Sequence, residues 1–321
     1  MGLTFLENPL FPLEGKNEEI TLTQDELLKL GLLPLEGKTL REREAGEKKI
    51  AVVFWGPPNS GKTTGCSKYV EENYKDLFSS MVPVSYDEPI LGQGKSGALF
   101  NIENYRTVYE KQAARALSGG EPDREALNEA YRKERSNSQR IRSYTINAAV
   151  EQGLDVCIDT TSASRGVFYM LDTLEKQGYE IHVVGMVSPL PVAEKRAQER
   201  LRLVEPDEVY SKREGAYGTF KELVEKRAAQ AVLLYNPVNG QSPVTALRLR
   251  DGAVVEKNEA VCAEIAENVL SEAVSCKEKE ISRPYADGLA KNGESFLSVV
   301  RAPVVPASYT KFSAPGNNFG S

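Results

Sequence analysis

Apolar, β-branched runs alternate with helix-like segments through the middle of the chain. Strands are predicted at residues 49–55, 82–86, 154–159 and 180–187. Helices are predicted at residues 62–78, 101–117, 123–151, 165–178 and 191–203. Because the two kinds of segment alternate, the pattern predicts an α/β, three-layer fold with a mainly parallel sheet.

The pattern changes toward both ends of the chain. A short helix signal flanked by turns precedes the first core strand, and an Asp-Gly turn at residues 251–252 predicts a hairpin. A last helix is expected at 257–274, and beyond about residue 280 the periodicity gives way to Pro, Gly and Ser. We therefore expect an N-terminal arm (1–47), a main domain (48–280) and a loosely ordered tail (281–321).

A glycine-rich loop lies between the first predicted strand and the helix after it. The run from Gly56 to Thr63 matches G-x-x-x-x-G-K-[ST], the phosphate-binding loop or P-loop. Lys62 is expected to reach the β- and γ-phosphates of a nucleotide such as ATP, and the Thr63 hydroxyl to ligate Mg²⁺. The predicted binding residues are Gly56, Asn59, Ser60, Gly61, Lys62, Thr63 and Thr64. The alternative is a strand-to-helix turn that binds nothing.

Two carboxylates stand at the ends of predicted strands, where ligands bind in parallel α/β sheets. Asp87 follows the strand at 82–86 and is a candidate base for the proton of a substrate hydroxyl. Asp159 closes the apolar run at 154–159 and is a candidate ligand for Mg²⁺, directly or through water. The alternative for both is a helix cap or a turn.

Composition narrows the classes of protein. The chain has 321 residues, a mean hydropathy of −0.40 and a net charge of −6, which argues against a protein that coats nucleic acid. The four cysteines form no C-x-x-C pair, which suits a reducing, cytoplasmic compartment. The single histidine, His182, is expected on a strand face. No apolar run approaches 18 residues, so a membrane span is not expected.

Two further patterns have competing readings. Residues 117–121 (LSGGE) match the ABC-transporter signature, but no buried strand follows them, so a helix end with a Gly-Gly turn is expected. Arg200 and Arg213 lie in basic segments that read either as solvated helix faces or as cations for phosphoryl transfer.

With these residues in place, residues 48–256 resemble the zeta-toxin family of P-loop kinases. The resemblance is strongest from Ile146 to Asp159 and from Leu174 to Ile181. It implies transfer of the ATP γ-phosphate to a hydroxyl of a nucleotide-like metabolite, with Asp87 as the base. It also makes Arg200 and Arg213 lid arginines, and it implies a protein inhibitor, either an antitoxin or a chaperone.

The chain departs from the family where the acceptor binds. It has Ser85-Tyr86-Asp87 in place of Asp-Asn-Asp, and residues 159–163 (DTTSA) in place of Glu-Gly-Thr-Gly-Arg. The acceptor is therefore left open between a nucleotide sugar and NAD. NAD is the acceptor of a plant-pathogen effector branch of this fold, which this chain could resemble. A secreted effector acting in the host cytosol is one outcome of that resemblance. A polynucleotide kinase and a non-catalytic, nucleotide-switched binding protein are the alternative functions.

The acceptor is expected next to Asp87. The predicted helix at 123–151 carries a group of arginines that would hold phosphates of an anionic acceptor. They are Arg132, Arg135, Arg140 and Arg142. The alternative is a solvated helix face.

Overall fold

The computed structural model describes residue 43 and residues 46–78, 80–86, 97–202, 204–238 and 240–305. The chain divides into two compact units, and each is described by itself. The P-loop unit comprises the described residues of 43–73, 160–198 and 204–305. The β2–β3 unit comprises the described residues of 74–159 and 199–203.

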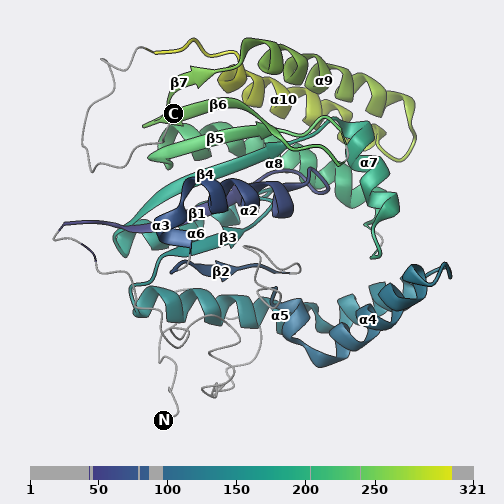
Figure 1. Ribbon diagram of the computed structural model, residues 1–321. Helices are drawn as coiled ribbons and strands as arrows, with labels where there is room; N and C mark the ends of the chain where they lie inside the picture. The colour runs from purple at the N-terminus through teal and green to yellow at the C-terminus, as the bar shows by residue number, and fades with distance from the viewer. Residues whose placement is uncertain are drawn as a thin grey trace. The chain divides into compact units, whose positions relative to one another are not determined.

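The P-loop unit contains strands in the spatial order β1-β4-β5-β6-β7 (Figure 1). Their bounds are Lys49–Trp55, Tyr179–Val187, Gln230–Tyr235, Val244–Arg250 and Ala253–Lys257. β1 pairs with β4 and β4 with β5 in parallel, whereas β6 and β7 are antiparallel. Residues 51–55 of β1 are fully buried, as expected for a parallel strand with helices on both faces.

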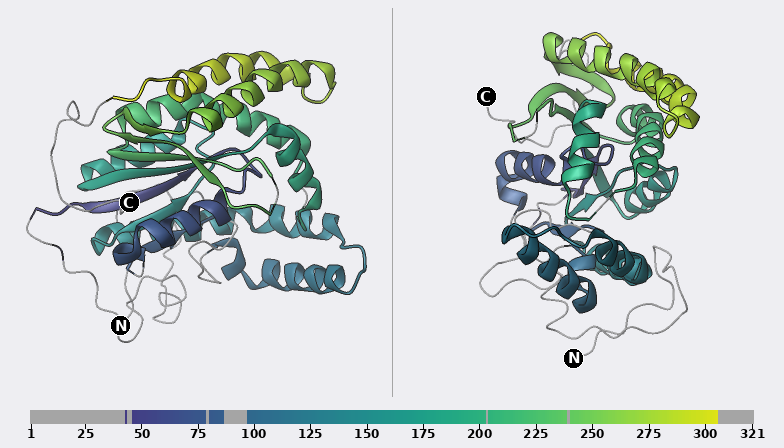
Figure 2. Two further views of the ribbon diagram at one scale, coloured as in Figure 1. Left: turned by 45° about the horizontal axis from the view of Figure 1, so that its top comes forward. Right: turned by 90° about the vertical axis from the view of Figure 1, so that its right-hand side faces the viewer.

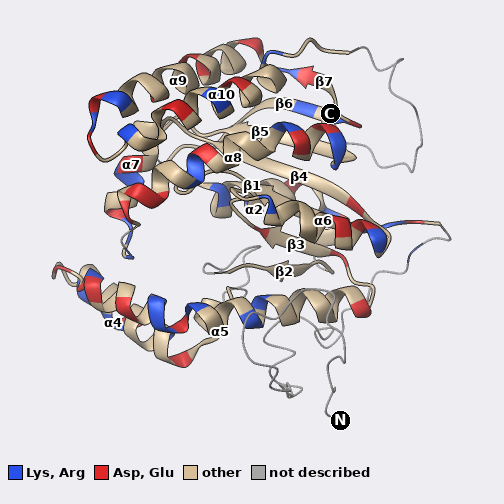
Figure 3. Ribbon diagram, turned by 180° about the vertical axis from the view of Figure 1, so that it is seen from behind, with Lys and Arg blue, Asp and Glu red and all other residues tan. Residues whose placement is uncertain are grey.

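Helices cover both faces of this sheet (Figures 1 and 3). α2 (Lys62–Asn73) lies on one face, and α6 (Gly166–Lys176) and α8 (Pro206–Lys226) lie on the other. The ring of Trp55 on β1 packs 4.4 Å from that of Phe220 on α8. The remaining helices are α7 (Leu190–Glu199), α9 (Glu259–Glu278), η2 (Arg283–Tyr285) and α10 (Ala286–Val300).

The helix α10 corrects the prediction of a loosely ordered tail. It lies beside α9 and packs on α8, and Leu289, Phe296 and Leu297 are buried (Figure 2). Phe296 stacks 4.9 Å from Tyr217 and 5.8 Å from Trp55. The prediction is therefore wrong for residues 281–305, because these apolar positions recur at helical spacing and bury one face. Residues 306–321 lie outside the described part.

The β2–β3 unit contains two parallel strands, β2 (Val82–Val84) and β3 (Val156–Asp159), with Val82 in register with Val156. Its helices are α3 (Lys75–Phe78), η1 (Leu99–Asn101), α4 (Glu103–Leu117) and α5 (Arg124–Glu151). The Asp123 carboxylate caps α5 by accepting the Ala126 N–H at 3.0 Å. Basic and acidic residues are interspersed along α4 and α5 (Figure 3).

The predicted fold class is confirmed: the protein is α/β, with a mainly parallel sheet between helical layers. The hairpin of β6 and β7 is confirmed, and so is the helix end at residues 117–121, where Gly119 has φ +81°. The predicted helix at 62–78 is divided at Tyr74 into α2 and α3. The strand β5 and the helix α8 were not predicted from the sequence. Apart from residues 43, 46 and 47, the predicted arm lies outside the described residues.

The single histidine is part of the sheet, as predicted. His182 on β4 is 4% exposed and lies 2.9 Å from a carboxylate oxygen of Glu180. The hydrogen bond to the imidazole is the main cause that lowers the pKa of Glu180. The four cysteines are buried, and none of them forms a disulfide.

Candidate functional site

The loop between β1 and α2 has a backbone shape that depends on glycine. Gly61 has φ +86° and Asn59 has φ +60°, both in the left-handed region. A Cβ atom on Gly56 would lie closer than 3.0 Å to the Met186 carbonyl oxygen of β4. The Ser60 N–H donates to the Pro57 carbonyl at 3.3 Å, and the Gly65 N–H donates to Gly61 at 2.9 Å. The chain thus turns tightly and enters α2 at Lys62.

Two side chains from elsewhere in the P-loop unit hold this loop. Arg196 on α7 donates from Nη1 to the Asn59 carbonyl at 3.2 Å and from Nη2 to Oδ1 of Asn236 at 3.1 Å. Asn236 follows β5, and its Nδ2 donates to the Ser60 carbonyl at 3.4 Å. A Cβ on Gly61 would lie 2.5 Å from that Nδ2. The loop is therefore held from two elements far apart in sequence.

Neither Arg196 nor Asn236 was predicted from the sequence to be part of the site. Arg196 lies in the predicted helix at 191–203, and the basic residues of that helix are equally typical of a solvated face. Asn236 comes directly after a strand that was not named. The apolar run Val232-Leu233-Leu234-Tyr235 was the available signal for that strand. Nothing in the sequence marks Asn236 itself as a partner of Arg196.

The polar groups of the loop suit a polyphosphate and Mg²⁺. Ser60 is fully buried, yet its hydroxyl has no hydrogen-bond partner. Lys62 and Thr63 are half-buried in the first turn of α2, where the helix N-terminus favours an anion. Burial raises the pKa of the Cys66 thiol to about 12, and the Lys62 charge opposes this rise. The loop thus offers a cation, hydroxyl groups and a helix N-terminus.

Of the two predicted carboxylates, only Asp159 lies in the described part of the chain, where it belongs to the β2–β3 unit. Asp159 ends β3 and is 6% exposed. Asp87 lies outside the described residues, but the backbone of the residue before it is fixed by two hydrogen bonds. The Tyr86 carbonyl accepts from the Ser138 hydroxyl at 2.7 Å and from the Leu99 N–H at 3.0 Å. Among the described residues, no group of three or more His, Cys, Asp or Glu side chains that could hold a metal ion is found.

The two predicted lid arginines, Arg200 and Arg213, differ in how deeply they are buried. Arg200 is half-buried in the segment after α7. Arg213 on α8 is only 1% exposed, and its Nε and Nη2 donate to the Glu272 carboxylate of α9 at 2.9 and 2.5 Å. Its Nη2 also donates to the Ser188 carbonyl. Burial is the largest single influence and lowers the pKa of Arg213, but the charges of Glu272 and Tyr217 and the hydrogen bonds to both residues together raise that pKa.

This placement corrects the expectation for Arg213. The side chain is buried between α8 and α9, and its charge is neutralised by Glu272 within the protein. A guanidinium held in this way stabilises the packing of two helices. It does not fit the predicted role of a lid cation that closes over a transferring phosphoryl group.

Comparison with known proteins points to one family. The family model described as Zeta toxin matches residues 122–241. The resemblance to the zeta-toxin family is confirmed. No curated protein gives a significant match to the chain. The zeta-toxin match supports a P-loop kinase-like, nucleotide-binding protein of the toxin type.

The chain is similar to several solved structures at low sequence identity, and three of them are described here. A chain of the AvrRxo1-ORF1–AvrRxo1-ORF2 complex with sulphate ions is 11% identical, with a TM-score of 0.45, and the match covers 78% of this chain and 81% of that one. A chain of the same complex with ATP is 11% identical, with a TM-score of 0.43, over 80% and 82%. A chain of the PezAT toxin–antitoxin system of Streptococcus pneumoniae is 12% identical, with a TM-score of 0.42, over 81% and 90%.

Proposed function

We infer that this protein is an Mg²⁺-dependent kinase that transfers the γ-phosphate of ATP to a hydroxyl of a nucleotide-like metabolite. The loop between β1 and α2 carries this inference. Its glycines adopt conformations that a side chain would obstruct, and Arg196 and Asn236 hold it from outside. The zeta-toxin match at 122–241 supports a phosphotransferase rather than a nucleotide switch.

The roles of the residues follow from their chemistry. Lys62 neutralises phosphate charge, and the Thr63 hydroxyl ligates Mg²⁺. When bound, Mg²⁺ offsets the negative charge that builds up on the phosphate oxygens. Asp87 accepts the proton of the acceptor hydroxyl, and Asp159 would help to hold the metal, directly or through water. Arg200 remains the proposed lid cation.

The resemblance also supports the proposals for the acceptor and the partner. The acceptor is a nucleotide sugar or NAD, and the protein inhibitor is an antitoxin or a chaperone. Action as a secreted effector belongs to the same proposal. No helix in the described part of the chain is both long enough and apolar enough to cross a bilayer.

Substitution of the loop lysine tests the kinase assignment. Lys62→Ala should keep the fold and reduce phosphotransfer by on the order of 10²–10³ or more, because a preorganised charge on the phosphates is lost. The matched control is Lys68→Ala on the same helix, whose exposed ammonium lies 4.0 Å from Glu72. The assay incubates each protein with labelled ATP, Mg²⁺ and a panel of nucleotide sugars, NAD and oligonucleotides, and identifies products by mass spectrometry.

The outcomes separate the alternatives. Near-native turnover by Lys62→Ala would sink the phosphate-loop assignment, whereas labelled oligonucleotides would identify a polynucleotide kinase. In the same assay Asp87→Asn should bind ATP normally but lose transfer, because the amide cannot accept the proton. Lost ATP affinity with turnover preserved at saturation would show that Asp87 is not the base.

A further inference from the structure

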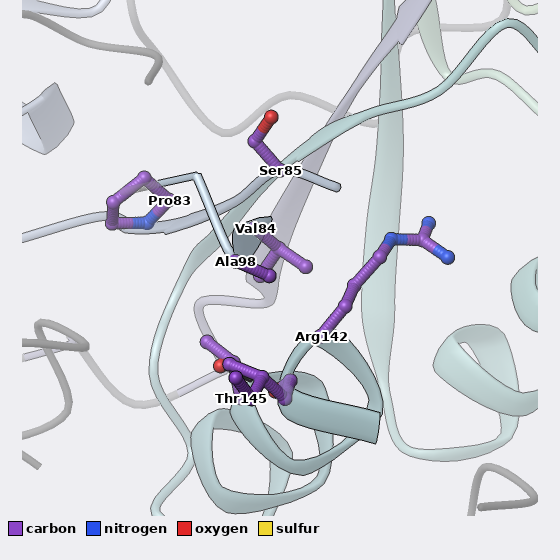
Figure 4. A pocket seen from close by; sticks show the side chains of 7 residues that line it. Pro83, Val84, Ser85, Ala98, Arg142 and Thr145 are labelled. Atoms are coloured by element: carbon purple, nitrogen blue, oxygen red, sulfur yellow. Dashed lines mark hydrogen bonds between the residues drawn. The ribbon is translucent and has the colours of Figure 1, made fainter. Parts of the chain in front are cut away.

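The space between the end of β2 and α5 is filled by the side chains around it. Ser85, Arg142 and apolar neighbours line it (Figure 4). They leave no room even for a water molecule, so this space is not a binding site. Arg132 on the same helix is exposed and pairs with Glu125 at 2.5 Å. The expected role of the helix at 123–151 in holding an acceptor therefore stays a prediction.

The helix α9 buries one face and exposes apolar side chains on the opposite face. Leu270 and Val274 are 47% and 61% exposed, and Ile281 in the turn after the helix is 51% exposed. Three of the eight exposed large hydrophobic side chains in the described part of the chain thus lie between residues 270 and 281. Single exposed apolar residues are normal, but a group of them marks an interaction surface.

The exposed residues of α9 form a continuous stripe. Its members are spaced alternately four and three residues apart, so they lie on one side of the helix. They are Ala263, Glu267, Leu270, Val274 and Lys277, and all are exposed. We call them the α9 stripe. At a rise of about 1.5 Å per residue the stripe is about 21 Å long, and its spacing is the one along which two helices pack side by side.

The order of residues in the α9 stripe is complementary to its own reverse. In an antiparallel pair of α9 helices centred halfway between Leu270 and Val274, each of these two residues faces the other on the second copy. Glu267 and Lys277 are equally far from that centre, so the carboxylate of one copy faces the ammonium of the other. By two-fold symmetry each contact occurs twice. Parallel pairing would instead bring like charges together.

The charged residues of the stripe can reach a second copy. Lys277 is 61% exposed and lies 3.4 Å from the carboxylate of Asp287, which is 94% exposed. An exposed pair of this kind contributes little to stability, so Lys277 can exchange this partner for Glu267 of another chain. The residues beside the stripe include the acidic Glu264 and Glu278. Their charge disfavours an anionic membrane or a nucleic acid as the occupant.

We propose that the α9 stripe is the interface of a homodimer in which the α9 helices of two copies pack antiparallel. Leu270 and Val274 form its apolar centre, and Glu267 and Lys277 form an ion pair at each end. One helix pair buries less than the standard ~800 Å² per partner, so the dimer is weak, with a Kd on the order of 10–100 µM. At low micromolar concentrations, as in a melting experiment, the chain is monomeric. The proposal uses no residue of the loop between β1 and α2 and is independent of the kinase assignment.

Sedimentation of the full-length protein from about 1 to about 500 µM tests the proposal. The mean mass of the unmodified protein should rise from 35.4 kDa toward twice that value. Val274→Asp should weaken the dimer about tenfold or more, because it places two carboxylates in the apolar centre. Glu267→Lys and Lys277→Glu should each have a similar effect, because two attractions become two repulsions. Glu225→Lys and Lys226→Glu make the same charge changes at exposed positions of α8 and should dimerise normally.

A mixture of the two α9 charge variants tests the antiparallel arrangement itself. When one chain carries Glu267→Lys and the other carries Lys277→Glu, opposite charges face each other at both ends of the pair. An equimolar mixture should therefore dimerise at concentrations where neither variant does so alone. Only an arrangement that places residue 267 of one copy against residue 277 of the other gives this result.

Each outcome decides the point. An unmodified protein that stays monomeric up to about 500 µM overturns the proposal, also where another segment or another protein covers the stripe. A dimer that Val274→Asp leaves intact, or that the α8 control variants weaken equally, overturns it as well. Failure of the mixture to regain the dimer overturns the antiparallel pairing. Should Val274→Asp fail to fold, as its melting curve would show, Glu267→Lys and Lys277→Glu carry the test.

Discussion

The buried pair of Arg213 and Glu272 permits a test that separates a structural arginine from a catalytic one. The Arg213 and Glu272 side chains are 1% and 3% exposed, and the Tyr217 hydroxyl also donates to Glu272 at 3.1 Å. Glu272→Gln keeps the shape of the side chain but removes the charge that neutralises the guanidinium. Breaking a buried ion pair by removing one partner costs about 3–5 kcal/mol. The Nη1 of Arg213 already has no partner, so little in the surroundings can compensate.

That cost converts into a measurable loss of thermal stability. For a domain of about 150–250 residues, each kcal/mol shifts Tm by roughly 2–4 °C, so the expected loss is roughly 6–20 °C. Glu267→Gln, an exposed position on the same helix, is the matched control and should change Tm little. Arg213→Gln should be similarly destabilising, and the double variant should lose less than the sum of the single losses. Circular dichroism melting and urea unfolding measure these changes.

The opposite pattern would refute the reasoning. If Glu272→Gln melts like the unmodified protein while Arg213→Gln folds normally and loses phosphotransfer, Arg213 is a working cation of the site. Its burial against α9 would then not be its role.

Two further predictions concern the core. Phe296→Ala should cost about 3–5 kcal/mol of unfolding free energy, because its ring packs on Trp55, Tyr217 and Phe220. The exposed Lys291→Ala should cost little, and equal melting of the two variants would show that α10 is not part of the core. Because burial raises the Cys66 pKa from 9.0 to about 12, its contribution to stability is full below pH 9 and lost as pH rises toward 12. Urea unfolding between pH 8 and pH 11 should therefore show a steeper loss than Cys66→Ala shows, and identical slopes would contradict the burial of the thiol.

The α/β class and the P-loop could both be predicted from local sequence patterns. Strand β1 and the hairpin of β6 and β7 carry strong local signals, namely a β-branched run and an Asp-Gly turn. Local signals failed where packing decides the structure. The apolar positions of α10 are separated by Gly, Asn and Ser, so the segment reads as a loose tail until α8 and α9 cover its buried face. The helix α8 was not predicted either, because its many charged residues resemble those of a solvated segment.

For the site, the sequence identified the chemically suitable residues but not the side chains that each of them contacts. Lys62 and Thr63 could be assigned because the P-loop is contiguous, and its function depends on neighbours in sequence. Arg196 and Asn236 could not, because they lie more than 130 positions from the loop in sequence and reach it only in the folded chain, where β5 pairs with β4. Tertiary packing also decides which arginines are structural and which lie at the site. The charge of a guanidinium is fixed by its residue type, but its role depends on which partner lies within reach, such as the Glu272 carboxylate for Arg213 or the Asn59 carbonyl for Arg196. Only tertiary packing decides that.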